Sequence, residues 1–264
     1  MREIYLPSFT EIFPKVFLAV LLSCFALVAL GQDPTDQRAT ARLQAGDTLG
    51  AIAVLKKELT SVRKPADVAN AEGFIKYLQH DDAGALEDFD RAIDLNADHA
   101  VAYHNRALVE GRLAMDSEAA GDYAAAIRID PYFLAAYWSR GLAKAGTGNY
   151  AEAVRDFSSV LAMKPDWTAA LYQRALAYGR LKEYKRQVSD LDQIVRLTPH
   201  DVKVYLARGM AKARQGRYDE AVDDYDLALG LEPENHDARF HKNAAEEKAF
   251  GRRAGTEALT STKE

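Results

Sequence analysis

Apolar and polar positions along this chain follow helical periodicity in segments of about one dozen residues, separated by turn-forming residues. Between Leu134 and Pro165 the helical pattern breaks once, at Ala145-Gly146-Thr147-Gly148-Asn149, and resumes at Tyr150. Glycine provides the backbone freedom that a tight reversal needs, and Pro165 cannot continue the helix that precedes it. This stretch therefore predicts two antiparallel helices joined by a short turn.

The same pattern recurs with a period of 34 residues, in five consecutive windows without insertion. Small residues prevail at the eighth and twentieth positions and aromatic residues at the twenty-fourth, and proline occupies the thirty-second position of four windows. The windows begin at Ala66, Ala100, Leu134, Thr168 and Val202. Such registered self-similarity predicts a stacked array, in which neighbouring units bury the apolar face that one unit cannot bury alone.

The pattern resembles the tetratricopeptide repeat, a helix–turn–helix unit of 34 residues with small, aromatic and proline residues at these offsets. The resemblance implies an all-α fold, a right-handed superhelical solenoid of stacked antiparallel helix pairs. Five repeats are expected at 66–99, 100–133, 134–167, 168–201 and 202–235. A degenerate repeat at 32–65 precedes them, and a capping helix at 236–250 and a disordered tail at 251–264 follow.

The fourth window departs most from the pattern. Gln187 replaces the small residue at its twentieth position, and Leu191 replaces the aromatic residue at its twenty-fourth. Two interpretations stay open for this window: a looser junction between units, or a local adaptation to a partner.

The N-terminus predicts export. A polar start containing Arg2 and Lys15 is followed by fifteen almost unbroken apolar residues, Val16 to Leu30, with small residues before Gln32. These features are typical of a secretory signal peptide spanning 1–31 and cleaved after Gly31. The alternative is an uncleaved membrane anchor at 16–30, although fifteen helical residues rise only about 22 Å, less than the roughly 30 Å of hydrocarbon to be crossed.

Cys24 is the only cysteine. The sequence around it resembles a lipoprotein processing site only weakly, and an apolar stretch rather than a polar tether would follow a lipidated Cys24. If cleavage follows Gly31, the mature chain has no cysteine and hence no disulfide or thiolate chemistry. We therefore expect a periplasmic or secreted protein, from a bacterial envelope, with membrane contact only through an uncleaved N-terminus or a lipidated Cys24.

The sequence offers no catalytic or cofactor motif. The six histidines are scattered, and none lies four residues from another on a predicted helix, as a helical metal site would require. A glycine-rich phosphate loop and a nucleophile elbow are both missing from the sequence. The net charge of −5 comes from interspersed acids and bases, a pattern that does not favour nucleic acid as a partner. We expect a non-enzymatic protein with no cofactor and no metal.

A charge pattern repeats across the windows. The twenty-third position is always aspartate, and the seventh is arginine in four of the five windows. Because the two positions have similar heights in an antiparallel pair, we expect ion pairs within a unit or across a junction. The residues are Arg106, Arg140, Arg174 and Arg208, with Asp122, Asp156, Asp190 and Asp224. The alternative is an arginine row that binds an anionic ligand, but an acid recurs wherever the arginine does.

The first helix of each unit also carries a stripe of side chains at the second, fifth, ninth, twelfth and thirteenth positions of the window. These positions share one helical face. In tetratricopeptide arrays this stripe lines a concave groove that receives a peptide or helix. The predicted groove residues are Phe74, Tyr77, His104, Leu108, Arg112, Trp138, Leu142, Tyr172, Leu176, Arg180, Leu206, Met210 and Arg214. Tryptophan, tyrosine and arginine are the residue types enriched at binding hot spots. The alternative is that these side chains pack against neighbouring helices or under the C-terminal helix.

The groove lacks the lysine and asparagine arrangement of the carboxylate-clamp type, so recognition of an acidic C-terminal peptide is not expected. A mainly apolar segment with a few acids that meet Arg112, Arg180 and Arg214 fits better. The sequence thus predicts a protein-binding scaffold of the cell envelope, an adaptor or assembly factor. The competing hypothesis is a structural, self-associating protein, a homo-oligomer whose apolar groove packs against another copy.

Overall fold

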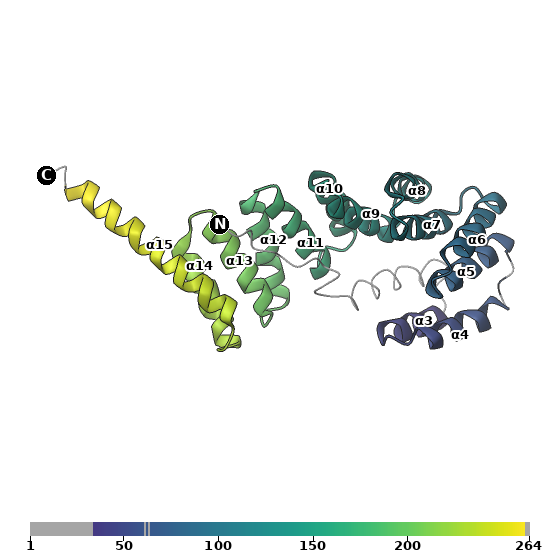
Figure 1. Ribbon diagram of the computed structural model, residues 1–264, viewed down its shortest axis with the longest axis horizontal. Helices are drawn as coiled ribbons and strands as arrows, with labels where there is room; N and C mark the ends of the chain where they lie inside the picture. The colour runs from purple at the N-terminus through teal and green to yellow at the C-terminus, as the bar shows by residue number, and fades with distance from the viewer. Residues whose placement is uncertain (1–33, 61, 63, 262–264) are drawn as a thin grey trace. The chain divides into compact units, whose positions relative to one another are not determined.

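The computed structural model describes residues 34–60, 62 and 64–261, which contain thirteen helices and no strand. The helices follow one another as hairpins of two antiparallel helices (Figure 1). This arrangement confirms the all-α fold of stacked helix pairs. The predicted signal peptide, the anchor alternative and Cys24 lie outside the described residues. None of the described helices is both long and apolar enough to cross a membrane.

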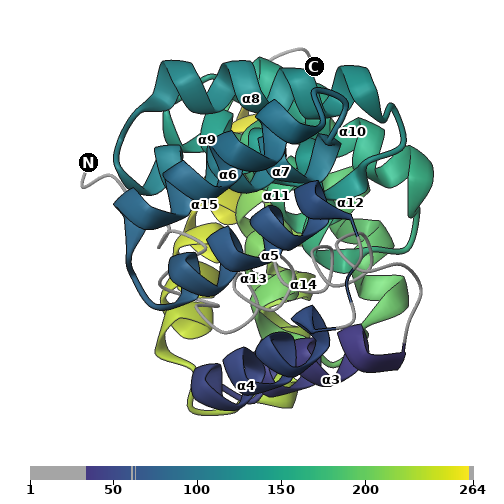
Figure 2. The ribbon, with the colours of Figure 1, turned by 90° about the vertical axis from the view of Figure 1, so that its right-hand side faces the viewer.

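The chain divides into two compact units, 1–143 and 144–264, and the division falls within α9. The helices of the first unit are α3 (Pro34–Gln44), α4 (Thr48–Leu59), α5 (Pro65–Leu78), α6 (Asp82–Leu95), α7 (Ala100–Arg112), α8 (Asp116–Ile129) and most of α9 (Leu134–Gly146). Consecutive helices from α3 to α8 pack on one another, and α5 also contacts α7. Figure 2 shows α3 beside α4 and α5 beside α6.

The second unit holds the end of α9 and six further helices. These are α10 (Tyr150–Met163), α11 (Thr168–Arg180), α12 (Tyr184–Leu197), α13 (Val202–Arg214), α14 (Tyr218–Leu231) and α15 (His236–Ser261). Each packs on the next, and α13 also contacts α15. From α5 onward, the first helix of each pair begins within one residue of an expected 34-residue window.

Close approach of the two helices in a pair depends on the eighth and twenty-fourth positions. A Cβ atom added to Gly73 would lie 2.8 Å from the Phe89 ring, and one added to Gly209 would lie 2.7 Å from the Tyr225 ring. Both distances are shorter than carbon atoms tolerate, so the aromatic ring occupies the space that glycine leaves free. The rings themselves are buried, and burial of each stabilises the fold by about 1.5–3 kcal/mol.

The fourth repeat solves the same packing problem with different residues. Gln187 is buried although it replaces a small residue, and its side chain lies against Gly179 of α11, where an added Cβ would be 2.8 Å from the amide nitrogen. The glutamine side chain on α12 thus fills the space that Gly179 on α11 leaves free. Leu191, in the aromatic position, is buried as well.

The C-terminal helix packs on α14 through Ala238 and Ala245, and Ala249 is buried as well. Its positions that would face a further helix carry Arg239 and Glu246, which are exposed. A polar outer face is what a terminal repeat needs in water. The structure continues α15 through Ser261, beyond residue 250, where the capping helix was expected to end, while disorder of the tail from residue 251 stays a prediction. That stretch is rich in arginine, alanine, glutamate and leucine, which are good helix formers and outweigh its two glycines.

Candidate partner-binding face

In the first unit, three of the predicted groove residues are buried. Phe74 is 2% exposed and both His104 and Trp138 are 0% exposed, whereas Tyr77 and Leu108 are half-buried. Leu142 on α9 is half-buried too. The fifth-position side chains of α7 and α9 therefore pack inside the array and offer no surface to a partner.

Buried polar groups line the same part of the first unit. Asn105 Nδ2 donates to Asn70 Oδ1 over 2.8 Å. His104 lies 3.3 Å from Asn105 Oδ1 and 3.1 Å from Ser139 Oγ through its two ring nitrogens. Burial lowers the pKa of His104 to about 4, so the imidazole is neutral at physiological pH. These contacts join first helices of successive repeats and serve their register.

In the second unit, the corresponding positions remain partly open. Tyr172 and Leu176 on α11, and Leu206 and Met210 on α13, are all half-buried. The fifth position of α15 is Phe240, which is 68% exposed. We call this set the C-terminal stripe: Tyr172, Leu176, Leu206, Met210 and Phe240. The fifth-position side chains of this stripe are more exposed than their buried counterparts in the first unit, whereas Leu176 and Met210 are half-buried as Leu108 and Leu142 are.

Cations stand at the thirteenth position of four windows, whereas Leu78 and Gly146 occupy it in the first and third. In the first unit, Arg112 forms an ion pair with Asp82 and stacks 4.0 Å from the centre of the Tyr77 ring. In the second unit, Arg180, Arg214 and Lys248 are exposed, and no carboxylate of the described residues lies within ion-pair distance of any of them. We call these three residues the cation row.

Three of the four seventh-position arginines pair with the aspartates of their own repeats. Arg106 donates to Asp122 over 2.6 and 2.8 Å, and Arg174 to Asp190 over 2.9 and 2.7 Å. Arg208 donates to Asp224, with a shortest distance of 2.6 Å. Bidentate pairs of this kind are stronger and geometrically more specific than single hydrogen bonds.

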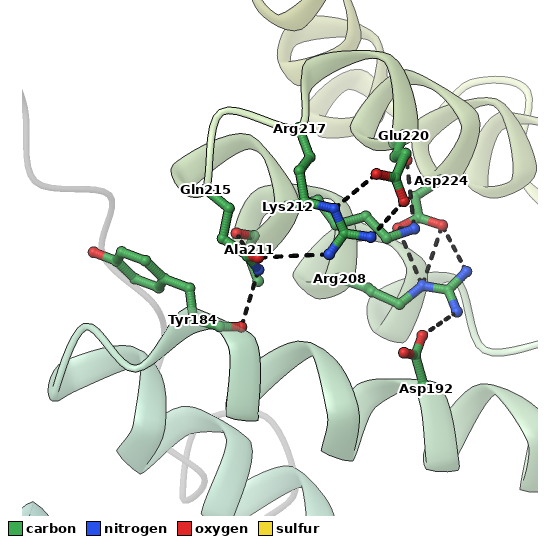
Figure 3. A network of polar contacts seen from close by, with 9 residues as sticks. All are labelled: Tyr184, Asp192, Arg208, Ala211, Lys212, Gln215, Arg217, Glu220 and Asp224. Carbon is green, nitrogen blue, oxygen red and sulfur yellow. Dashed lines mark hydrogen bonds and ion pairs between the residues drawn. The ribbon is translucent and has the colours of Figure 1, made fainter.

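The same arginines also reach the preceding repeat. Figure 3 shows Arg208 between Asp224 of its own repeat and Asp192 of the repeat before, 2.8 Å away. Arg106 likewise donates to Asp90, and Arg174 to Ser158. On α15, Lys242 occupies the seventh position and pairs with Asp226. The charge pattern thus links neighbouring repeats as well as the two helices of one repeat.

Lysines at the eleventh position add a second partner for the aspartates, one that the predicted arginine–aspartate pattern did not include. Lys212 lies 2.9 Å from Asp224, and Lys144 lies 3.2 Å from Asp156. In the first window, where Glu72 replaces the arginine, Lys76 lies 2.8 Å from Asp88. The signal was present, because a lysine four residues after the seventh position shares its helical face.

The second window breaks this rule with Glu110 at the eleventh position. Its side chain is buried, and its Oε2 atom is buried without a hydrogen-bond partner among the described residues. Burial, followed by the nearby Asp122 carboxylate, raises the pKa of Glu110 to about 7. A buried carboxyl beside a second carboxylate can hold a proton, but the described residues bring no group of three or more His, Cys, Asp or Glu side chains together for a metal.

Comparison with known proteins agrees with this geometry. Two tetratricopeptide-repeat family models match the chain, over residues 139–202 and 202–235. No curated protein sequence matches it. Among solved structures, YrrB, titled a tetratricopeptide-repeat protein with an unusual peptide-binding site, superposes with a TM-score of 0.62 at 16% identity and covers 72% of this chain and 97% of its own.

Two further structures share the fold. MamA from Desulfovibrio magneticus RS-1 has a TM-score of 0.58 at 16% identity, covering 66% of this chain and 98% of its own. The C-terminal part of a repeat protein from Cytophaga hutchinsonii has a TM-score of 0.59 at 20% identity, covering 74% and 78%. Tetratricopeptide repeats are thus present in this chain, and its fold is that of tetratricopeptide-repeat proteins.

Proposed function

We propose that this protein is a non-enzymatic scaffold that holds a segment of a partner protein along its C-terminal stripe. The observation that carries the proposal is the accessibility of that stripe, since the scaffold leaves Tyr172 and Leu206 only half-buried and Phe240 mostly exposed. Apolar groups that a fold does not bury itself are typical of a partner surface. The likeness to YrrB, a repeat protein described by its peptide-binding site, supports the same role.

Burial moves the proposed site away from some of the residues that the sequence favours. Phe74, His104 and Trp138 are closed, so a partner would have to displace neighbouring helices to reach them. The proposal therefore centres on α11, α13 and α15. Together with the predicted signal peptide, it describes an adaptor or assembly factor of the cell envelope.

Site-specific photo-crosslinking in the native cell tests this proposal. A benzoylphenylalanine residue at Phe240 would label a protein bound to the stripe. The matched control is the same residue at Tyr132, an aromatic side chain that is 82% exposed and lies in the loop between α8 and α9. We expect a defined cross-linked partner from position 240 and none from position 132. Equal labelling from both positions would contradict a partner site on the stripe.

Self-association is the second candidate function, favoured by the two exposed aromatic residues of α15, Phe240 and Phe250. The same experiment separates the two ideas. A cross-link from position 240 to a second copy of the chain, together with a molecular mass that rises with concentration, would indicate a homo-oligomer.

A further inference from the structure

We propose that the C-terminal stripe selects an amphipathic peptide segment that carries acidic residues along one edge. The apolar side chains of the segment lie on the stripe, and its carboxylates meet the cation row of Arg180, Arg214 and Lys248. This inference rests on the proposed function, because it specifies the chemistry of the segment that the scaffold holds.

The first observation is that one junction between repeats already contains an ion pair of the kind that a partner would form in the second unit. Arg112 at a thirteenth position forms an ion pair with Asp82, the seventeenth-position residue of the preceding repeat. The Asp82 carboxylate therefore marks a place beside a thirteenth-position cation that a carboxylate fits. In the first unit the chain fills this place itself.

The second observation is that the second unit replaces that aspartate. The seventeenth positions of its repeats are tyrosines, and Arg214 lies 5.8 Å from the centre of the Tyr184 ring while Lys248 lies 5.7 Å from that of Tyr218. A tyrosine ring holds a cation in place through its face but does not neutralise its charge. The cations of the second unit thus stay available to an external anion.

Helix-end electrostatics explains only part of the cation row. Arg180 and Arg214 are the last residues of α11 and α13, where a positive charge stabilises the helix dipole. Lys248, by contrast, lies well inside α15, which runs to Ser261, so no helix end accounts for it. What the three share is their place at the thirteenth position, at one end of the apolar stripe.

The apolar stripe and the charge together define the occupant. Leu206, Met210 and Phe240 offer apolar contact area, and exposed arginines beside tyrosines are typical of binding hot spots. A purely apolar segment would leave three cations without partners, and a purely acidic one would leave the stripe uncovered. A segment with apolar residues on one face and Asp or Glu along its edge satisfies both.

Selection from a library of random 16-residue peptides displayed on phage, with the full chain as the target, tests the inference. We expect the recovered peptides to combine apolar residues with an excess of Asp and Glu over the starting library. Synthetic copies of them should bind more weakly as salt rises, because salt screens ion pairs at the surface. Replacing their acids with Asn and Gln should weaken binding at least tenfold.

The decisive variant is the double substitution Tyr184→Asp and Tyr218→Asp, which gives the second unit the internal carboxylates that the first unit has. Both residues begin helices, as Asp82 and Asp116 do, and aspartate is favourable at such positions. We expect circular dichroism like that of the wild type and at least tenfold weaker binding of the acidic peptides. Arg214→Glu should weaken binding similarly, whereas Arg155→Glu, an equal charge change at an exposed site on α10, should leave it unchanged.

The outcomes separate the two proposals. Peptides that bind the stripe without an excess of acids, or whose affinity the aspartate variants do not change, would overturn this inference and leave the scaffold function intact. Recovery of no binding peptide at all would count against the scaffold function and, with it, against the acidic segment.

Discussion

At the scale of single residues, Glu110 is the clearest departure from the repeat. Its pKa of about 7 lies above the ordinary value, so the folded chain keeps a proton that the unfolded chain has released. The stabilising contribution of the protonated carboxyl is therefore lost as pH rises from about 4.5 to 7. Above that range a second negative charge lies buried near Asp122, with Arg106 as the nearby cation.

We accordingly predict that Glu110→Gln stabilises the first unit at alkaline pH. At pH 8 the free energy of unfolding should rise by about 1–2 kcal/mol, because the amide is neutral where the carboxylate is charged. Urea unfolding at pH 5 and pH 8 would measure the gain, which should be confined to the higher pH. Glu118→Gln, on the exposed neighbour of the same carboxyl, is the control; an equal pH dependence in wild type and Glu110→Gln would refute the assignment.

The turn between paired helices requires a left-handed backbone conformation at one residue. Its fifteenth position has a positive φ in every repeat from α5 onward, with Gly148 and Gly216 in two repeats and His80, Ala114 and Lys182 in the others. Residues with a Cβ adopt this left-handed conformation at a cost of about 1–2 kcal/mol. Three turns of the array therefore carry backbone strain.

Ala114→Gly should relieve this strain. We predict a gain of about 0.5–1 kcal/mol in the free energy of unfolding, since the relief exceeds the greater entropy that glycine loses on folding. Ala124→Gly provides the matched control, because Ala124 is also exposed but lies inside α8, where glycine costs about 1 kcal/mol. Denaturation curves of the two variants should shift in opposite directions, and a shift in the same direction would exclude strain at position 114.

The repeat pattern predicted the position of each residue on its helix better than it predicted the exposure of its side chain. The periodicity places Tyr172 and His104 at equivalent positions, yet one is half-buried and the other fully buried. The difference depends on which side chains of the neighbouring repeat reach the site, such as Ser139 against His104. A repeat pattern specifies the face of a helix, whereas exposure depends on contacts between repeats that the pattern averages out.

At the scale of helices, arginine–aspartate pairs connect the two members of a hairpin. Their seventh and twenty-third positions could be paired from sequence because antiparallel helices joined by a short turn place those positions at equal height. The hydrogen bonds from these arginines to the preceding repeat do not follow from the pairing rule, since Arg174 donates to a serine there and Arg208 to an aspartate. The helix α15 extends to Ser261, beyond residue 250, because arginine, alanine, glutamate and leucine in that stretch favour a helix.

A double-mutant cycle on Arg174 and Asp190 tests the energetic role of these pairs. Asp190 is buried, so Arg174→Ala leaves an uncompensated charge, and we predict a loss of about 3–5 kcal/mol. The double variant should lose less than the sum of the single ones, giving a coupling energy of at least about 1 kcal/mol. The exposed pair of Arg186 and Glu183 should show a coupling below about 0.5 kcal/mol; similar values for both cycles would mean that burial does not strengthen the pair.

At the scale of the whole molecule, a repeat array is held together by contacts between neighbours, so its stability is a sum of repeat and interface terms. Each repeat lacks a core of its own, which makes the last element of the array as important as the first. In the second unit that element is α15, whose buried alanines cover the α13–α14 pair. Ala245 lies in one apolar cluster with Tyr225 and Ala221.

Truncation after Asn235 should therefore weaken the second unit as a whole. Without α15, Tyr225 and its neighbours lose their cover, and we predict a loss of at least about 2 kcal/mol from the newly exposed apolar surface, together with concentration-dependent association. Truncation after Gly251 is the control, because it retains Ala238, Ala245 and Ala249. Hydrogen exchange would locate the effect: faster exchange in α13 and α14 of the shorter chain alone would establish α15 as the cap, whereas unchanged protection there would show that the α13–α14 pair is stable without it.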